Sequence, residues 1–267
     1  MATEMVQVRG VDLAVHDAGE SGLPFVWAHG LTSNGQHEDA MGMFRWGALD
    51  DIRLIRYDAR GHGGSQGTLD PDDYAWPALA GDLLALMDRL GLERSAIGGA
   101  SMGCATALFA ALAAPERIER LVLVIPPTAW DTRAAQRDVY LAGAQLIADT
   151  GTAAMIERSR LQPPVGAFGV DGERLRDLGL TRLADFDPQL LATIMRGAAS
   201  SNLPPPDVLS TVRQPALVLA WAGDPVHPVS TAARLGEILP TAEVHVADDL
   251  AAIAGWPELV HEFLVAR

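Results

Sequence analysis

Residues 95–112, SAIGGASMGCATALFAAL, run from a strand pattern into a helix pattern and decide the fold class. Between the two lies GASMG, residues 99–103, which is G-x-S-x-G in a strand–turn–helix setting. Such a turn holds the serine in a strained conformation and projects its Oγ above the edge of the sheet. The flanking Gly99 and Gly103 suit positions where the backbone approaches too closely for larger side chains. We therefore predict that Ser101 is a nucleophile.

Short apolar runs elsewhere predict the remaining strands. They are Met5–Arg9, Val11–His16, Pro24–Ala28, Ile52–Tyr57, Ser95–Gly99, Leu121–Ile125, Ala216–Trp221 and Glu243–Val246. The first two read as an antiparallel pair, and strand–helix alternation follows, with helices predicted over 76–90 and 102–113. The later runs are almost continuously apolar, as in parallel strands covered on both faces. We predict an α/β fold, a mostly parallel sheet of about eight strands flanked by helices.

The alternation breaks between residues 126 and 214, where helical patches dominate. Asp187 can cap one such helix, and Pro188 suits its first turn. We predict a helical cap over 126–214, inserted into a core made of residues 1–125 and 215–267.

Composition limits the partners and the compartment. The 267 residues suffice for one sizeable core, and the net charge of −14 repels phosphate backbones and anionic lipids. We therefore expect a small-molecule substrate and neither nucleic acid nor membrane as partner; the oligomeric state is open. One cysteine, no signal-peptide pattern and no membrane-length apolar run favour the cytoplasm. No phosphate loop or H-E-x-x-H motif occurs, so no cofactor and no metal is expected.

Three further segments accompany the serine motif in order: VWAHGLTSNG (26–35), IRYDARGHGGSQG (55–67) and ALVLAWAGDPVHP (216–228). With these segments the chain resembles the α/β-hydrolase superfamily over almost its whole length. The resemblance implies an oxyanion hole formed by the backbone N–H groups of Leu31 and Met102. It also implies that Asp224 is the triad acid, and Asp131 is a weaker alternative.

The general base is the open question. The resemblance places it on the loop after the last strand, near Leu250, but no histidine lies in that loop. Chain order requires a histidine after the acid. We predict His245, on or at the end of the last strand, as the base. We interpret His227 as a loop residue and His261 as a helix residue.

Two functional hypotheses follow. The first is a serine hydrolase that acts on an ester or related acyl substrate through Ser101, Asp224 and His245. The second is a hydrolase-like scaffold with an incomplete triad that binds a small apolar ligand or catalyses a non-hydrolytic reaction. An imidazole nitrogen within about 3.2 Å of the Ser101 Oγ atom, and held by Asp224, would favour the enzyme.

Overall fold

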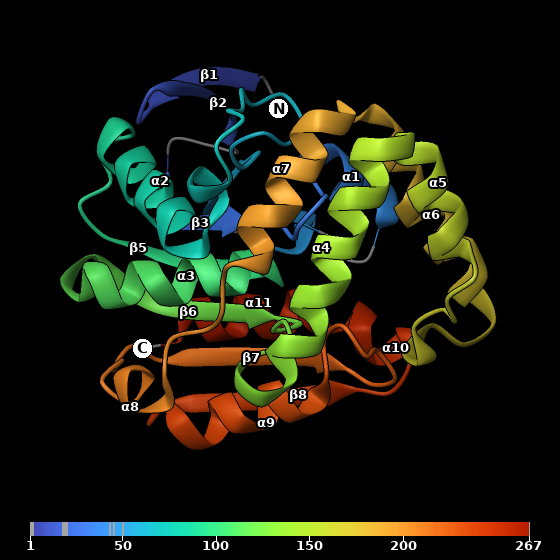
Figure 1. The fold of residues 1–267 in the computed structure, drawn as a ribbon. Helices are drawn as coiled ribbons and strands as arrows, with labels where there is room; N and C mark the ends of the chain where they lie inside the picture. The colour runs from blue at the N-terminus through green and yellow to red at the C-terminus, as the bar shows by residue number, and fades with distance from the viewer. Residues whose placement is uncertain (1–2, 18–20, 43, 45, 50, 267) are drawn as a thin grey trace.

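The computed structural model describes residues 3–17, 21–42, 44, 46–49 and 51–266 (Figure 1). The outermost residues of the predicted core, 1–2 and 267, lie outside this part of the chain. Eight strands form one sheet, so the predicted fold class is confirmed. The strands are β1 (Thr3–Val8), β2 (Val11–Asp17), β3 (Leu23–Ala28), β4 (Ile52–Tyr57), β5 (Ser95–Ala100), β6 (Ile118–Val124), β7 (Ala216–Trp221) and β8 (Ala242–Ala247).

The strand order is β1-β2-β4-β3-β5-β6-β7-β8. β1 pairs antiparallel with β2 and β2 with β4, whereas every later neighbouring pair is parallel. The carboxyl ends of β3 to β8 therefore share one edge of the sheet. The loops after β3, β5 and β7, which contain Leu31, Ser101 and Asp224, meet at that edge.

Helices cover both faces of the sheet. One core cluster joins the sheet to α2 (Trp76–Arg89), α3 (Met102–Ala113), α8 (Pro206–Leu209) and α9 (Val229–Ile238). The other cluster joins it to α1 (Gly35–Met41), α10 (Leu250–Ala254) and α11 (Trp256–Val265). None of the helices in the described ranges has both the length and the apolarity of a membrane span.

A helical segment lies between β6 and β7. It contains α4 (Arg133–Thr150), α5 (Thr152–Arg160), α6 (Gly172–Thr181) and α7 (Pro188–Ala199). Asp187 caps α7 by accepting a hydrogen bond from the Leu190 amide, as its sequence predicts. α4 and α7 lie side by side (Figure 1) around a small core of their own. α6 packs on α1, and α7 packs on the turn Pro71–Tyr74, so both contact elements near the edge with the functional loops.

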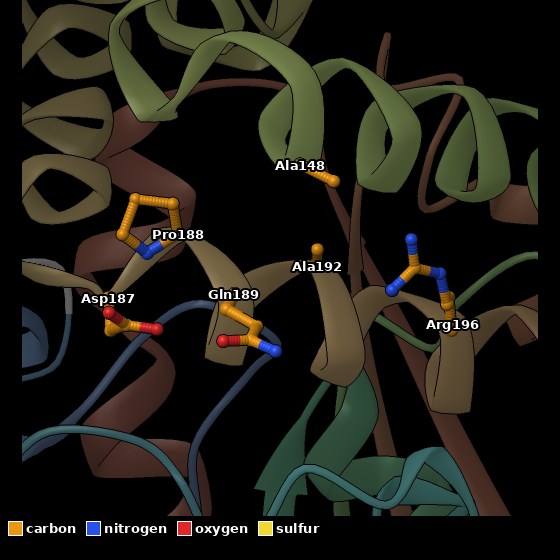
Figure 2. Close-up of a pocket in the computed structure, with 6 residues that line it drawn as sticks. All are labelled: Ala148, Asp187, Pro188, Gln189, Ala192 and Arg196. Atoms are coloured by element: carbon orange, nitrogen blue, oxygen red, sulfur yellow. The ribbon is translucent and has the colours of Figure 1, made fainter.

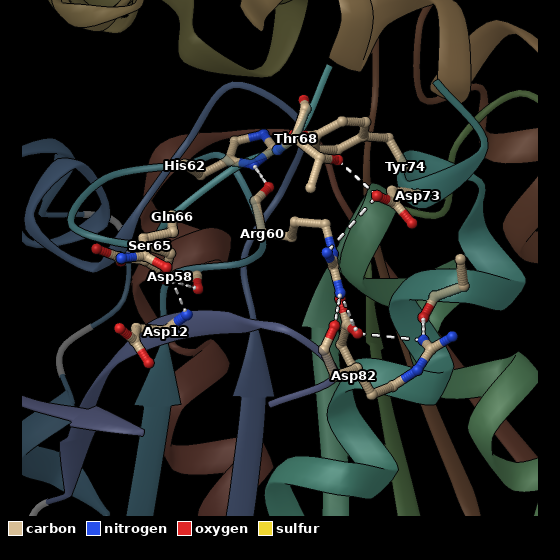
Figure 3. Close-up of polar contacts among 12 residues, drawn as sticks. Asp12, Asp58, Arg60, His62, Ser65, Gln66, Thr68, Asp73, Tyr74 and Asp82 are labelled. Atoms are coloured by element: carbon tan, nitrogen blue, oxygen red, sulfur yellow. Dashed lines mark hydrogen bonds and ion pairs between the residues drawn. The ribbon is translucent and has the colours of Figure 1, made fainter. Parts of the chain in front are cut away.

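The segment after β4 is held by a buried ion pair (Figure 3). Arg60 donates two hydrogen bonds of 2.9 Å to the carboxylate of Asp82 on α2. Arg9 of the β1–β2 turn reaches the same carboxylate at 3.1 Å. Asp58 accepts hydrogen bonds from the amides of Gly35 and Gly64. These contacts join the loops after β3 and β4, and so fix the backbone that runs past Ser101.

Replacing Asp82 with Ala should destabilise the protein by about 3–5 kcal/mol, because the buried Arg60 guanidinium would lose both of its short charged hydrogen bonds and keep only Asp73, at 3.7 Å. Urea unfolding measures this change. The matched control is Glu237→Ala, which removes an exposed partner of Arg234 and should cost less than about 1 kcal/mol. Equal losses in the two variants would contradict the expectation.

Candidate active site

Ser101 occupies a strained turn between β5 and α3. Its backbone has φ +52° and ψ −106°, a region that residues other than glycine rarely adopt. The Ser101 amide donates to the Val124 carbonyl at 3.0 Å, which ties the turn to β6. A Cβ atom at Gly103 would lie 2.0 Å from the Ala28 carbonyl oxygen, so only glycine allows α3 to start this close to β3. The predicted turn geometry is present at Ser101.

Three side chains form one chain of hydrogen bonds at this turn. The Oγ atom of Ser101 lies 2.8 Å from Nε2 of His227, and Nδ1 of His227 lies 2.7 Å from Oδ2 of Asp224. An ionised carboxylate only accepts hydrogen bonds, so Nδ1 carries a proton and donates it to Asp224. In the neutral imidazole Nε2 is then free to accept the hydrogen bond of the Ser101 hydroxyl. The three groups have the connectivity of a Ser–His–Asp triad.

Asp224 is held as a carboxylate. Trp221 Nε1 donates to its Oδ2 and the Val226 amide to its Oδ1, each at 2.9 Å. Burial alone would raise the pKa of Asp224. The hydrogen bond and charge of His227, together with the two other donors, outweigh burial and lower this pKa to about 2. The carboxylate is therefore ionised at neutral pH, where it can stabilise a protonated imidazole.

Aromatic rings surround the acid and the histidine. The Trp221 ring stacks on Trp256, with centroids 6.1 Å apart, and meets Phe168 edge-on at 4.9 Å. Its other neighbour is His227, at 6.2 Å and nearly perpendicular. Only 16% of the His227 side chain and 7% of the Asp224 side chain are exposed. Their hydrogen bonds therefore lie in a largely water-excluded setting, where they are stronger than in bulk water.

The prediction that His245 partners Ser101 is wrong. His245 lies within β8, in register with Leu219 of β7, and its Nε2 contacts Glu243 Oε1 at 2.6 Å. Its side chain is 36% exposed. Because His245 lies within the strand, it does not reach the loops that carry Ser101 and Asp224. His227 is a loop residue, as its sequence predicts, and it is the histidine that contacts Ser101.

The region where the resemblance placed a base has another structure. The chain begins α10 at Leu250, and Asp249 caps this helix by accepting from the Ala252 amide at 2.8 Å. The weaker acid candidate, Asp131, is exposed in the turn after β6.

The turn after β7 explains why His227 lies beside Asp224. Gly223 has φ +75°, so the chain turns sharply after β7 and directs Asp224 back towards the sheet edge. In the segment D-P-V-H-P, a spacing of three residues brings the imidazole onto the carboxylate of its own loop. The sequence alone gave no reason to prefer this short-range pairing over a histidine from the last strand.

Two backbone amides are available beside Ser101. Met102 is the first residue of α3, where an N–H has no carbonyl partner within the helix. Within the described ranges, neither this amide nor that of Leu31 donates to a protein acceptor. A Cβ atom on Gly30 would lie 3.6 Å from the Ser101 Cβ, which places the loop after β3 against the serine.

The two upstream histidines support this loop. His29 Nε2 accepts from the Ala59 amide at 2.8 Å, and His62 Nε2 accepts from the Thr32 amide at 3.3 Å. Burial lowers the pKa of both, that of His62 to about 3, so both imidazoles are neutral at neutral pH. They fix backbone and do not reach the serine. Among the described residues, no group of three or more His, Cys, Asp or Glu side chains is arranged to hold a metal.

Comparison with known proteins identifies the family to which this fold belongs. The sequence model of the alpha/beta hydrolase fold family matches residues 24–153. A protein of Caulobacter sp. (strain K31) named putative carbamate hydrolase RutD is 33% identical over 202 residues, which cover 74% of this chain and 73% of the relative. The 3-oxoadipate enol-lactonase 2 of Acinetobacter baylyi is 28% identical over 199 residues, covering 74% and 72%. The chain therefore belongs to the α/β hydrolase fold family.

Solved structures show the same fold. The enol-lactonase from Burkholderia xenovorans LB400 superposes with a TM-score of 0.79 at 23% identity, covering 98% of this chain and 99% of that one. A hydrolase from Pseudomonas aeruginosa PA01 superposes with a TM-score of 0.78 at 25% identity, covering 99% and 98%. The relatives are named as hydrolases, and the chain is accordingly a hydrolase of this fold.

Reaction with a fluorophosphonate, which forms a covalent bond to an activated serine, should depend on His227. Ser101→Ala should abolish labelling, and His227→Ala should slow it by about 10³-fold or more, because no other imidazole reaches Oγ. His245→Ala is the matched control and should label within about twofold of wild type. Labelling that fails in His245→Ala and survives in His227→Ala would contradict the geometry.

The stability difference between wild type and Asp224→Asn should depend on pH. The pKa of Asp224 is lowered from 3.8 to about 2, so its carboxylate stabilises the fold above pH 3.8 and stops doing so as the pH falls through 2. Asp224→Asn should therefore cost on the order of 2 kcal/mol at pH 6 and progressively less between pH 4 and pH 2. Urea unfolding at several pH values measures the difference; a constant difference would refute this linkage.

Proposed function

We propose that the protein is a serine hydrolase that cleaves an ester or related acyl substrate, with Ser101 as nucleophile, His227 as general base and Asp224 as acid. The observation that carries the proposal is the hydrogen bond of 2.8 Å between Ser101 Oγ and His227 Nε2, continued at 2.7 Å to Asp224. No cofactor takes part in this chemistry.

In the first half-reaction the Ser101 Oγ atom attacks the substrate's carbonyl carbon while its proton passes to His227 Nε2. The imidazolium is stabilised by Asp224, which stays ionised. The tetrahedral intermediate collapses, the bond to the leaving group breaks, and His227 gives its proton to that group. In the second half-reaction a water molecule donates a proton to His227 and attacks the acyl-enzyme. Release of the acid returns the proton to Ser101.

The developing oxyanion needs donors that are already in place. We assign this role to the amides of Leu31 and Met102, because both lie beside Ser101 and neither is used by a described acceptor. The Met102 amide also stands at the N-terminus of α3, where the helix dipole favours negative charge. Removing one such donor typically costs about 10²–10³ in kcat.

In the substrate that we propose, the leaving group is bonded to the carbonyl carbon through an oxygen or nitrogen atom. One relative is named for hydrolysis of a carbamate and others for opening an enol-lactone. Both substrates present a carbonyl carbon bonded to oxygen or nitrogen, which suits the same nucleophile and oxyanion hole. We therefore propose a small molecule with an ester, lactone or related bond, hydrolysed in the cytoplasm, with residues 126–214 serving as a cap that shapes its binding site.

The alternative, a hydrolase-like scaffold with an incomplete triad that binds a small apolar ligand or catalyses a non-hydrolytic reaction, requires that no imidazole lie near Ser101. His227 lies within hydrogen-bonding distance and is held by Asp224, which is the arrangement expected of an enzyme. The site therefore favours turnover over simple ligand binding.

Wild-type protein should hydrolyse p-nitrophenyl acetate with a rate that depends on Ser101 and His227. His227→Ala should lower kcat by about 10³–10⁶-fold, since the loss of an imidazole leaves only oxyanion stabilisation and binding. His245→Ala should retain wild-type kcat. Initial rates followed by absorbance of the released nitrophenolate, with thermal melting to confirm folding, test the proposal. A wild type no faster than Ser101→Ala on p-nitrophenyl acetate, a small lactone and an aryl carbamate would overturn it.

A further inference from the structure

Arg182 extends from the helical segment to the loop that we assign to the oxyanion hole. It begins the short helix Arg182–Asp185 after α6. Its Nη2 and Nε atoms donate to the Thr32 hydroxyl at 3.0 and 3.2 Å. Thr32 directly follows Leu31. The guanidinium therefore contacts the residue next to the amide that we assign to the oxyanion hole. Nearby, Phe186 packs edge-on against His62 of the loop after β4, with centroids 5.5 Å apart, and His62 in turn accepts the hydrogen bond of the Thr32 amide.

The positive charge of Arg182 has no counter-charge in the described part of the chain, where no carboxylate forms an ion pair with it. Its remaining contact is His37, whose Nε2 lies 3.4 Å from Nη1. Burial and the nearby Arg182 lower the pKa of His37 to about 4, so this imidazole is neutral. Burial lowers the pKa of Arg182 to about 10, so the guanidinium remains a cation at neutral pH.

Arg182 is partly buried, and the three arginines that are more deeply buried are arranged differently. Arg60 pairs with Asp82, and Arg56 pairs with Asp39. The chain has 34 acidic residues, yet none of the described ones pairs with Arg182. Arg133 is also buried, but its donors reach Ser201 and Ala198 carbonyls. A desolvated cation is costly unless it is paired, and an arginine offers five N–H donors. Three hydrogen bonds are formed by Arg182, which leaves two N–H groups for an anionic ligand.

We infer that Arg182 binds a carboxylate of the substrate, so that the preferred substrates are esters or lactones whose acyl part carries a free carboxylate. The inference rests on the proposed function and specifies its substrate class. A guanidinium matches a carboxylate in shape and can bind it through two parallel hydrogen bonds. The Thr32 hydroxyl orients the guanidinium, and the neutral histidines around it keep the local charge positive.

The test compares substrates that differ only in charge. Mono-p-nitrophenyl succinate, glutarate and adipate carry a carboxylate, and p-nitrophenyl butanoate, pentanoate and hexanoate are their uncharged counterparts. In Arg182→Gln the ratio of kcat/KM for the best charged ester to that of its neutral partner should fall by about 10- to 100-fold, the range for loss of a charged hydrogen bond. The ratio is the readout because it cancels any loss of activity that the charged and the neutral ester share. Arg182→Lys keeps the charge but not the planar guanidinium. Its charged-to-neutral ratio of kcat/KM should lie between those of wild type and Arg182→Gln.

The matched control is Arg196→Gln. Arg196 also lies on the helical segment and has no ion pair within the described ranges, but it lines a cavity of about 500 Å³ between α4 and α7 (Figure 2). The lining residues include no triad member and are Ala148, Asp187, Pro188, Gln189, Ala192 and Arg196. This variant should leave the charged-to-neutral ratio unchanged. An equal fall in both variants would show a long-range charge effect and overturn the assignment to Arg182.

Binding separates failure of this inference from failure of the proposed function. Calorimetric titration of Ser101→Ala with glutarate and adipate requires no turnover, and Arg182→Gln added to this variant should weaken the tighter of the two by at least 10-fold. Loss of binding on that substitution would support the carboxylate site even if no ester were hydrolysed. Two results would overturn the inference. One is an unchanged charged-to-neutral ratio of kcat/KM in Arg182→Gln while the esters are hydrolysed. The other is an unchanged affinity for both glutarate and adipate when Arg182→Gln is added to Ser101→Ala. The melting temperature of Arg182→Gln shows whether the variant is folded at the assay temperature.

Discussion

The close approach of α3 to β3 is the constraint on which the site depends. The backbone of Gly103 lies against the Ala28 carbonyl, and a Cβ atom at Gly99 would lie 2.5 Å from the same oxygen. With both sides of the turn held this tightly, Ser101 has no relaxed conformation available and adopts φ +52°. The strain costs about 1–3 kcal/mol and is sustained by the core packing of β5 and α3. In return, the Oγ atom lies within 2.8 Å of His227 Nε2, and the Met102 amide at the start of α3 follows directly.

The acid and the base that we propose come from a single loop. Asp224 and His227 are three residues apart between β7 and α9, so their relative position is set by one local turn and does not depend on how β8 packs. The Trp221 side chain connects this turn to the core through its stack on Trp256 and its hydrogen bond to Asp224. The only long-range requirement is that the β7 loop meet Ser101, which the shared edge of the parallel strands β5, β6 and β7 ensures.

The sequence predicts the fold well because strand and helix patterns are local. Ile52–Tyr57, Ala216–Trp221 and Met102–Ala113 were predicted with the bounds that the structure gives. Asp187 was found as a cap because its hydrogen bond to the Leu190 amide spans three residues. The partner of Ser101 was not found, because it is decided by the direction in which a loop side chain points. His227 and His245 are both histidines after the acid, and only the register of β8 and the turn at Gly223 separate them.

Because the base that we propose lies on the β7 loop, β8 and the loop after it need not contribute a catalytic residue. His245 faces outward beside Glu243. Asp249 serves as the N-cap of α10, and the resemblance would have placed the base next to it, near Leu250. The short helix α10 then packs Ile253 into the second core cluster and leads directly into α11. α10 also contacts the Gly166–Asp171 turn of the helical segment, so this end of the sheet is used to hold that segment in place. The same segment carries Arg182 to Thr32 in the loop after β3 and Phe186 to His62 in the loop after β4. The end of the sheet that holds no proposed catalytic residue therefore supports the segment that contains Arg182, the residue we assign to substrate recognition.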